Sequence, residues 1–308
     1  MSRRGDLLSK YLVISTAVID QIHLSNGEYV GDYLGGAGIY ALCGLRIWCD
    51  DVTLITGIGS DFLPSWNKWF IQNRCSTAGL YECDPCTPHT DVRYLQSGQR
   101  IDTPLFGKEH YKKMEADTPK ISHFLEDATG VYIFQEIPSN YWDSILEHKK
   151  KHNFKLEWEL NDLVACPSRL EEVRKIACQC DIFSLNHSEA QSLLAVSDTE
   201  SIIADLKNWD VPMIFLRLGS DGSIIIRNQS ITKIPSISCG NVIDPTGAGN
   251  SSSAAVLYGY CENYNDYQCG ILGSISAAKC IEQFGPPDLS RMDRDELLAL
   301  LNQISSST

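Results

Sequence analysis

The sequence predicts an α/β protein with a central, mostly parallel sheet flanked by helices. Two observations predict this class. Short runs rich in β-branched residues alternate with helix-like stretches along most of the 308 residues. Hydrophobic residues make up 43% of the chain and charged residues 21%, a composition that supports a substantial folded core. We expect a single domain over residues 1–308, because no repeat or long linker interrupts the pattern.

The predicted elements follow one another in a regular order. The expected strands cover residues 11–18, 52–56, 131–134, 155–158, 181–185 and 213–218. Helix-like stretches lie between them near residues 38–48, 65–73, 139–150, 168–178 and 187–195. A hairpin is expected over 223–227 and 231–235, followed by helices near 247–260, 265–283 and 292–303.

Two polar segments, 21–34 and 87–112, do not fit this rhythm. The first alternates in polarity around Asn26 and Gly27, and the second contains a strand-like run from Val92 to Leu95. Strands that project from the main sheet could form a small β-lid over a ligand crevice. Two surface hairpins without a function are the alternative that the pattern leaves open.

Charge and composition exclude several classes of function. The net charge is −13, and the clustered Lys and Arg that a nucleic-acid partner requires are absent. The N-terminal stretch lacks the apolar core of a signal peptide, and no run of apolar residues is long enough to span a membrane, so we expect a cytoplasmic protein. The 12 cysteines then indicate buried or free thiols, and the CxxC pair Cys83 and Cys86 lacks a second pair of zinc ligands.

The most informative motif is Asp-Pro-Thr-Gly-Ala-Gly-Asn at residues 244–250, just before a predicted helix. Gly247 and Gly249 allow a ligand to approach the backbone closely. The N–H groups of Gly247, Ala248 and Gly249 at a helix N-terminus would form an anion site suited to a phosphoryl group. A glycine-rich helix start that only packs against a strand is the alternative.

Other candidate residues lie where predicted strands end. Asn186 and Glu189 follow the apolar run 182–185, at the edge where open α/β sheets bind ligands. Glu189 could accept hydrogen bonds from metal-bound waters, although a plain helix N-cap is the alternative. Asp20 follows the first predicted strand, and its carboxylate is suited to binding adjacent hydroxyls, or is simply solvated.

The chain resembles the ribokinase-like (PfkB) family of carbohydrate kinases. The matching segments occur in family order and are 35–42, 52–62, 186–189, 216–222, 244–250 and 277–285. The resemblance implies a ribokinase-like fold with a β-lid, and ATP-dependent phosphorylation of a hydroxyl on a small sugar, polyol or nucleoside-like compound. It implies ATP and Mg²⁺ as cofactors, and leaves a monovalent cation and a homodimer open.

The resemblance also implies roles for individual residues. Those expected in phosphoryl transfer are Asn250, Gly247, Ala248 and Gly249. Those expected to bind the nucleotide and its metal are Asn186, Glu189 (through water), Gly219, Gly222, Asp244, Thr246 and Ala277. Those expected to bind the acceptor are Asp20, Gly35, Gly36 and Tyr40.

Two positions depart from the family pattern. Tyr40 stands where the family often has Asn, and Asn250 stands where its Asp takes a proton from the attacking hydroxyl. Because an amide is not basic near neutral pH, Asn250 can only orient that hydroxyl. Asp244 and Glu159 are candidates for a substitute base, and a nucleotide- or sugar-binding pseudokinase is the alternative function. Trp158-Glu159 and Cys166-Pro167 more loosely resemble a divergent branch that includes the fungal maintenance-of-killer proteins.

Overall fold

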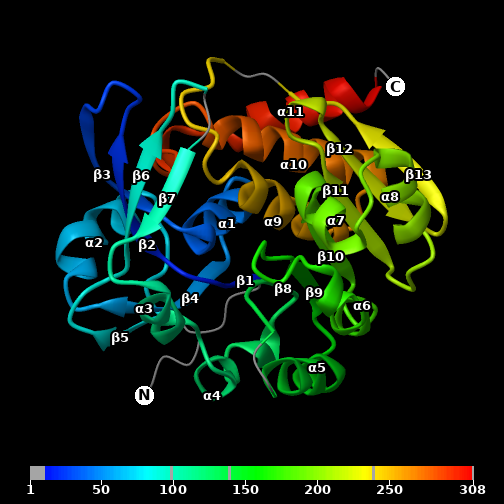
Figure 1. Cartoon of the computed structure of the whole chain (residues 1–308), viewed down its shortest axis with the longest axis horizontal. Helices are drawn as coiled ribbons and strands as arrows, with labels where there is room; N and C mark the ends of the chain where they lie inside the picture. Colours follow the sequence, from blue (N-terminus) through cyan, green and yellow to red (C-terminus); the bar gives the residue numbers. More distant parts are fainter. Residues whose placement is uncertain (1–10, 98–99, 138–139, 238–239, 307–308) are drawn as a thin grey trace.

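The computed structural model describes residues 11–97, 100–137, 140–237 and 240–306, and contains two sheets (Figure 1). The main sheet has nine strands in the order β13-β12-β11-β10-β9-β8-β1-β4-β5. These strands are β1 (Tyr11–Ile14), β4 (Val52–Gly59), β5 (Leu80–Asp84), β8 (Gly130–Phe134), β9 (Lys155–Glu159), β10 (Ile182–Asn186), β11 (Met213–Arg217), β12 (Ser223–Arg227) and β13 (Ser230–Ile234). All neighbours pair in parallel except β11 with β12 and β12 with β13, which pair antiparallel.

Helices cover both faces of this sheet, which explains why its central strands are apolar nearly throughout. One face packs against α1 (Ala37–Arg46), α2 (Phe62–Gln72), α9 (Ala248–Cys261), α10 (Asp266–Cys280) and α11 (Arg294–Ser306). The other face packs against α4 (Thr118–Ile121), α5 (Tyr141–His152), α6 (Leu170–Ala177), α7 (His187–Leu194) and α8 (Thr199–Leu206). The ribokinase-like α/β fold expected from the sequence is therefore confirmed.

The second sheet, named the lid sheet or lid after its expected role, has four strands in the order β3-β2-β6-β7. Its strands are β2 (Val18–His23), β3 (Tyr29–Gly35), β6 (His89–Tyr94) and β7 (Arg100–Pro104), and they stand at the left of the view in Figure 1. Strands β2 and β6 are parallel, and the other two pairs are antiparallel.

The structure differs from the sequence expectations at several element boundaries. The predicted strand 11–18 is two strands, because β1 ends at Ile14 and Val18 already begins lid strand β2. The chain leaves the main sheet at Thr16, whose carbonyl accepts the N–H of Gly38 at 2.9 Å. The far end of the expected lid segment 87–112 belongs instead to helix α3 (Lys108–Met114). Strand β5 and helix α8 were not expected.

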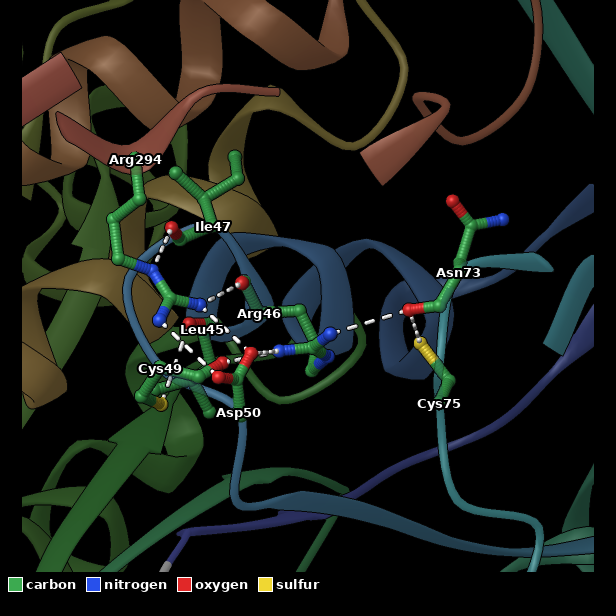
Figure 2. A network of polar contacts seen from close by, with 8 residues as sticks. All are labelled: Leu45, Arg46, Ile47, Cys49, Asp50, Asn73, Cys75 and Arg294. Carbon is green, nitrogen blue, oxygen red and sulfur yellow. Dashed lines mark hydrogen bonds and ion pairs between the residues drawn. The ribbon is translucent and has the colours of Figure 1, made fainter. Parts of the chain in front are cut away.

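A buried arginine fixes the C-terminal end of α1 (Figure 2). Arg46 is 7% exposed, and its Nη1 donates to the carbonyl of Cys49 and to Asp50 Oδ1, both at 2.6 Å. Its Nη2 donates to the carbonyl of Asn73 at 3.2 Å, while Arg294 of α11 donates to Asp50 Oδ1 at 3.0 Å. This network joins α1, α11 and the segment after α2, so it holds in place the helix whose other end carries the candidate acceptor residues.

Candidate active site

The N-terminus of α9 forms the turn that the sequence singled out. Gly247 is the N-cap with φ of +78°, in the left-handed region that glycine tolerates best. A Cβ at Gly247 would overlap the ring of Tyr40, which packs directly on this glycine. The N–H of Ala248 is not directed at a ligand as expected, because it donates to the carbonyl of Pro245 at 3.3 Å. Close packing by Tyr40 therefore also accounts for the glycine at position 247.

A cavity of about 530 Å³ opens beside this turn. Of the residues expected to bind the nucleotide, Asn186, Gly219, Gly222 and Ala277 line it, together with Ala248 and Gly249. They come from the ends of β10 and β11, the start of the β12 hairpin, the N-terminus of α9 and helix α10. Four segments that are distant in sequence thus meet at the carboxyl edge of the sheet, the edge at which open α/β sheets bind ligands.

A buried polar cluster lies next to the cavity. Asn250 Nδ2 donates to Glu159 Oε1 at 3.0 Å and to the Tyr132 hydroxyl at 3.2 Å. The Tyr132 hydroxyl donates to Glu159 Oε2 at 2.8 Å. Arg217 Nη1 lies 2.9 Å from Glu159 Oε1, and its Nη2 lies 3.6 Å from Glu189 Oε2. Asn250 of α9 is therefore held by the carboxylate of Glu159, the last residue of β9.

Sequence reasoning missed Arg217. The signal was an arginine at the end of a buried strand, two residues before the predicted nucleotide glycine Gly219. Strand position alone does not say where so long a side chain goes. In the structure its guanidinium lies against Gly249, where a Cβ would overlap Nη1.

Asn186 and Glu189 form a complete capping box at the start of α7. Asn186 Oδ1 accepts the N–H of Glu189 at 2.9 Å, and Glu189 Oε2 accepts the N–H of Asn186 at 2.7 Å. Burial raises the pKa of Glu189 to about 7, although the nearby Arg217 opposes this rise. Asn186 thus caps α7, as one of the two interpretations of the sequence predicted, and it also lines the cavity.

Asp244 and Thr246 contact the lid sheet, while Pro245 between them lines the cavity, and their expected role in nucleotide binding stays a prediction. Asp244 accepts hydrogen bonds from the Tyr94 hydroxyl and from the backbone N–H of Thr246, the latter at 2.8 Å. Arg100 of β7 donates to the Thr246 hydroxyl. The segment before α9 is thus in contact with both β6, through Tyr94, and β7, through Arg100. The lid therefore meets the main body at the turn that begins α9.

The residues expected to bind the acceptor gather beneath the lid. Asp20 lies within lid strand β2, two residues into it, rather than after a strand of the main sheet. It is 7% exposed and faces Gly35 so closely that a Cβ there would overlap its carboxylate. Gly36, with φ of +94°, caps α1, and Tyr40 lies one turn further along that helix. Burial raises the pKa of Asp20 to about 7, against the opposing charge of Arg100.

The donor set fits a nucleotide and a water-mediated Mg²⁺ better than a dedicated metal cage. Among the described residues no group of three or more His, Cys, Asp or Glu could hold a metal ion. Mg²⁺ bound mainly by phosphates and water needs only one or two carboxylates, and Glu189 stands beside the cavity. Cys83 and Cys86 are both exposed free thiols. Within the described ranges, every helix is too short or too polar to cross a bilayer.

The fold and this site define a ribokinase-like α/β protein in which a glycine turn lies between the cavity and the buried residues Asp20 and Tyr40. The chain belongs to the pfkB family of carbohydrate kinases, whose family model matches residues 9–291. It is 25% identical to an uncharacterized protein of Schizosaccharomyces pombe, over 90% of this chain and 86% of that one. It is 23% identical to a cytidine kinase of Thermococcus kodakarensis, over 89% of this chain and 96% of that one. The structure of Arabidopsis thaliana ribokinase complexed with ribose and ATP superposes with a TM-score of 0.75 at 18% identity, covering 96% of this chain and 99% of that one.

Proposed function

We propose that this protein transfers the terminal phosphoryl group of ATP to a hydroxyl of a small sugar, polyol or nucleoside-like acceptor. The nucleotide binds in the cavity framed by Asn186, Gly219, Gly222 and Ala277. The acceptor binds beneath the lid, where the Asp20 carboxylate accepts hydrogen bonds from its hydroxyls. Family membership and the names of the relatives support this reaction class without selecting the acceptor.

One observation carries the proposal: a single turn lies between the cavity and Tyr40, one of the residues expected to bind the acceptor. Gly249 lines the nucleotide cavity, while Gly247 two residues earlier packs on Tyr40, on the acceptor side. A phosphoryl group that moves from the cavity toward an acceptor beside Tyr40 would pass the positive end of the α9 dipole. Charge stabilisation and positioning are the main needs of a loose phosphoryl-transfer transition state.

Asn250 orients the acceptor in this scheme and does not remove its proton. Its Nδ2 is engaged by Glu159 and Tyr132, so its carbonyl oxygen is the group that can accept a hydrogen bond from the attacking hydroxyl. Mg²⁺, held through water by Glu189, would neutralise phosphate charge when bound. Glu159 contacts Asn250 directly, whereas Asp244 is engaged by Tyr94 and Thr246, so Glu159 is the better candidate for a substitute base.

The alternative is a pseudokinase that binds the nucleotide and transfers nothing. Asn250 favours it, because general-base help is typically worth about 10²–10⁴-fold in rate. The structure keeps the cavity and the α9 turn in either case. What separates the two functions is turnover, since ATP binding is common to both.

The test combines ATP binding with a screen of acceptors. Purified protein with ATP and Mg²⁺ should melt at a higher temperature than without them, because a ligand of the native state stabilises it. Production of ADP should then be measured with ribose, other sugars, polyols and nucleosides. Gly249→Val, whose Cβ would overlap the Arg217 guanidinium at the cavity wall, should abolish the ATP-dependent shift, and circular dichroism should show that the variant keeps its fold. ATP binding without phosphorylation of any acceptor would establish the pseudokinase.

A further inference from the structure

The guanidinium of Arg217 stands at the wall of the nucleotide cavity. Arg217 is the last residue of β11 and lines the cavity together with Ala248 and Gly249 of the α9 turn. Its guanidinium rests on Gly249, so a Cβ at that position would displace it. A fixed cation therefore borders the same turn that presents the positive end of the α9 helix dipole.

The ion pairs of Arg217 leave hydrogen-bond donors unused. Nη1 pairs with Glu159 Oε1 at 2.9 Å, but Nε and Nη2 have no hydrogen-bond partner among the described residues. Nη2 does lie 3.6 Å from Glu189 Oε2, which is an ion pair too long for a good hydrogen bond. Buried donors without partners are costly, and a ligand with several acceptor oxygens would satisfy them.

The carboxylates of Glu159 and Glu189 hold the Arg217 side chain in place without using all of its hydrogen-bond donors. Glu159 also accepts from Asn250 and Tyr132, so its charge is shared among three donors. Glu189 Oε2 already accepts the N–H of Asn186 at 2.7 Å and lies 3.6 Å from Nη2, so it does not use that donor. A forked guanidinium with two donors unused matches the geometry of phosphate oxygens.

We propose that Arg217 binds the terminal phosphates of the nucleotide and supplies part of the positive charge that would otherwise come from the metal. The inference rests on the proposed nucleotide site and adds to it a specific residue and a reduced dependence on Mg²⁺. If Arg217 only neutralised Glu159 and Glu189, its replacement would change the affinities for ATP and AMP equally. Discrimination between ATP and AMP therefore separates the two roles.

The test measures equilibrium binding of ATP and AMP in EDTA and in excess Mg²⁺. Wild-type protein should bind ATP in EDTA and lose little relative to Mg²⁺. Arg217→Gln should weaken ATP binding at least tenfold in EDTA, change AMP binding by less than about twofold, and recover part of the ATP affinity when Mg²⁺ is added. Arg217→Lys keeps the charge and removes the forked guanidinium, so its ATP affinity should lie between those of the wild type and Arg217→Gln. It also keeps the test usable if Arg217→Gln fails to fold.

Arg227→Gln is the matched control. Arg227 lies on the adjacent strand β12, pairs with Asp266 at 3.0 Å and does not line the cavity. It should leave both affinities unchanged, and circular dichroism should show that all variants keep the native spectrum. Equal changes of ATP and AMP affinity in both Arg217 variants, or no change in either, would overturn the role of Arg217 while leaving the nucleotide site in place. A wild-type protein that binds no ATP under any condition would overturn the site itself.

Discussion

The side-chain amide of Asn250 donates a hydrogen bond to Oε1 of Glu159 at 3.0 Å. The pair joins the first turn of α9 to the last residue of β9. Glu159 is 2% exposed, so a second carboxylate at position 250 would lie beside a buried one. An amide at position 250 therefore suits a site beside the buried carboxylate of Glu159. The replacement of the family's Asp by Asn is coupled to that neighbour.

Asn250→Asp should destabilise the protein and give no gain in turnover. It removes a hydrogen bond to a charged group, worth about 1.5–3 kcal/mol, and forces one carboxyl of the new pair to take up a proton. Asn250→Asp combined with Glu159→Gln restores one carboxylate and one amide, and should recover much of the lost stability. Thermal denaturation and ADP production of the single and double variants check this. A single Asn250→Asp variant that is as stable as the wild type and at least tenfold faster would show that Glu159 is not coupled to it.

Gly247→Ala should destabilise the protein more than a substitution at a comparable open glycine. The left-handed φ of +78° costs about 1 kcal/mol for alanine, and the added methyl also overlaps Tyr40. Gly27→Ala is the control, because Gly27 has φ of +85° with no atom within 4 Å of an added Cβ. Urea denaturation should give a larger loss at Gly247, accompanied by weaker ATP binding. Equal losses at the two glycines would contradict the packing of Tyr40 on the turn.

Asp20→Asn should change how stability depends on pH. Burial raises the pKa of Asp20 from 3.8 to about 7, so the native state holds a proton that the unfolded state releases over that interval. The Asp20 contribution to the free energy of unfolding is present below about pH 4 and falls as pH rises, by about 1.4 kcal/mol per pH unit up to about pH 7. Denaturant titrations from pH 4 to pH 8 should therefore show Asp20→Asn gaining stability relative to wild type. Parallel curves would mean that Asp20 is not desolvated.

Asp20→Ala should impair the acceptor and spare the nucleotide. Loss of a charged hydrogen-bond partner costs about 1.5–3 kcal/mol, so KM for the acceptor should rise roughly tenfold or more. ATP affinity should stay within about twofold, because Asp20 lies on lid strand β2 and does not line the nucleotide cavity. Steady-state kinetics with the identified acceptor and a separate ATP titration check both halves. A comparable loss of ATP affinity would place Asp20 in the nucleotide site.

Arg46→Ala should lower stability without changing ligand binding directly. It removes charge-assisted hydrogen bonds to the carbonyls of Cys49 and Asn73, which we expect to cost about 1–3 kcal/mol. Arg294→Ala, on the exposed side of the same network, should cost less. Denaturation midpoints give the stabilities, and ATP titration at a temperature where both variants are folded gives the affinities. Loss of ATP binding by folded Arg46→Ala would mean that this network acts on the cavity.

The elements that the sequence predicted well are those encoded by local patterns. The helix start at Gly247 followed from its glycine turn, and the parallel strands followed from short apolar runs between helical stretches. The break within residues 11–18 was not predicted, because buried strands of either sheet have the same apolar character. Asp20 consequently lies in the lid and not after a main-sheet strand.

By itself the sequence determined the α/β class, most of its alternation of strands and helices, and the turn at 247–249, since these depend on neighbouring residues along the chain. Only the tertiary structure decided that Arg217 rests on Gly249, that Glu159 holds Asn250 and that Asp244 contacts the lid. Each contact joins residues from separate elements, so it depends on strand order and helix packing. A side chain's partner across such distances is set by where the folded backbone places it, which no local pattern specifies.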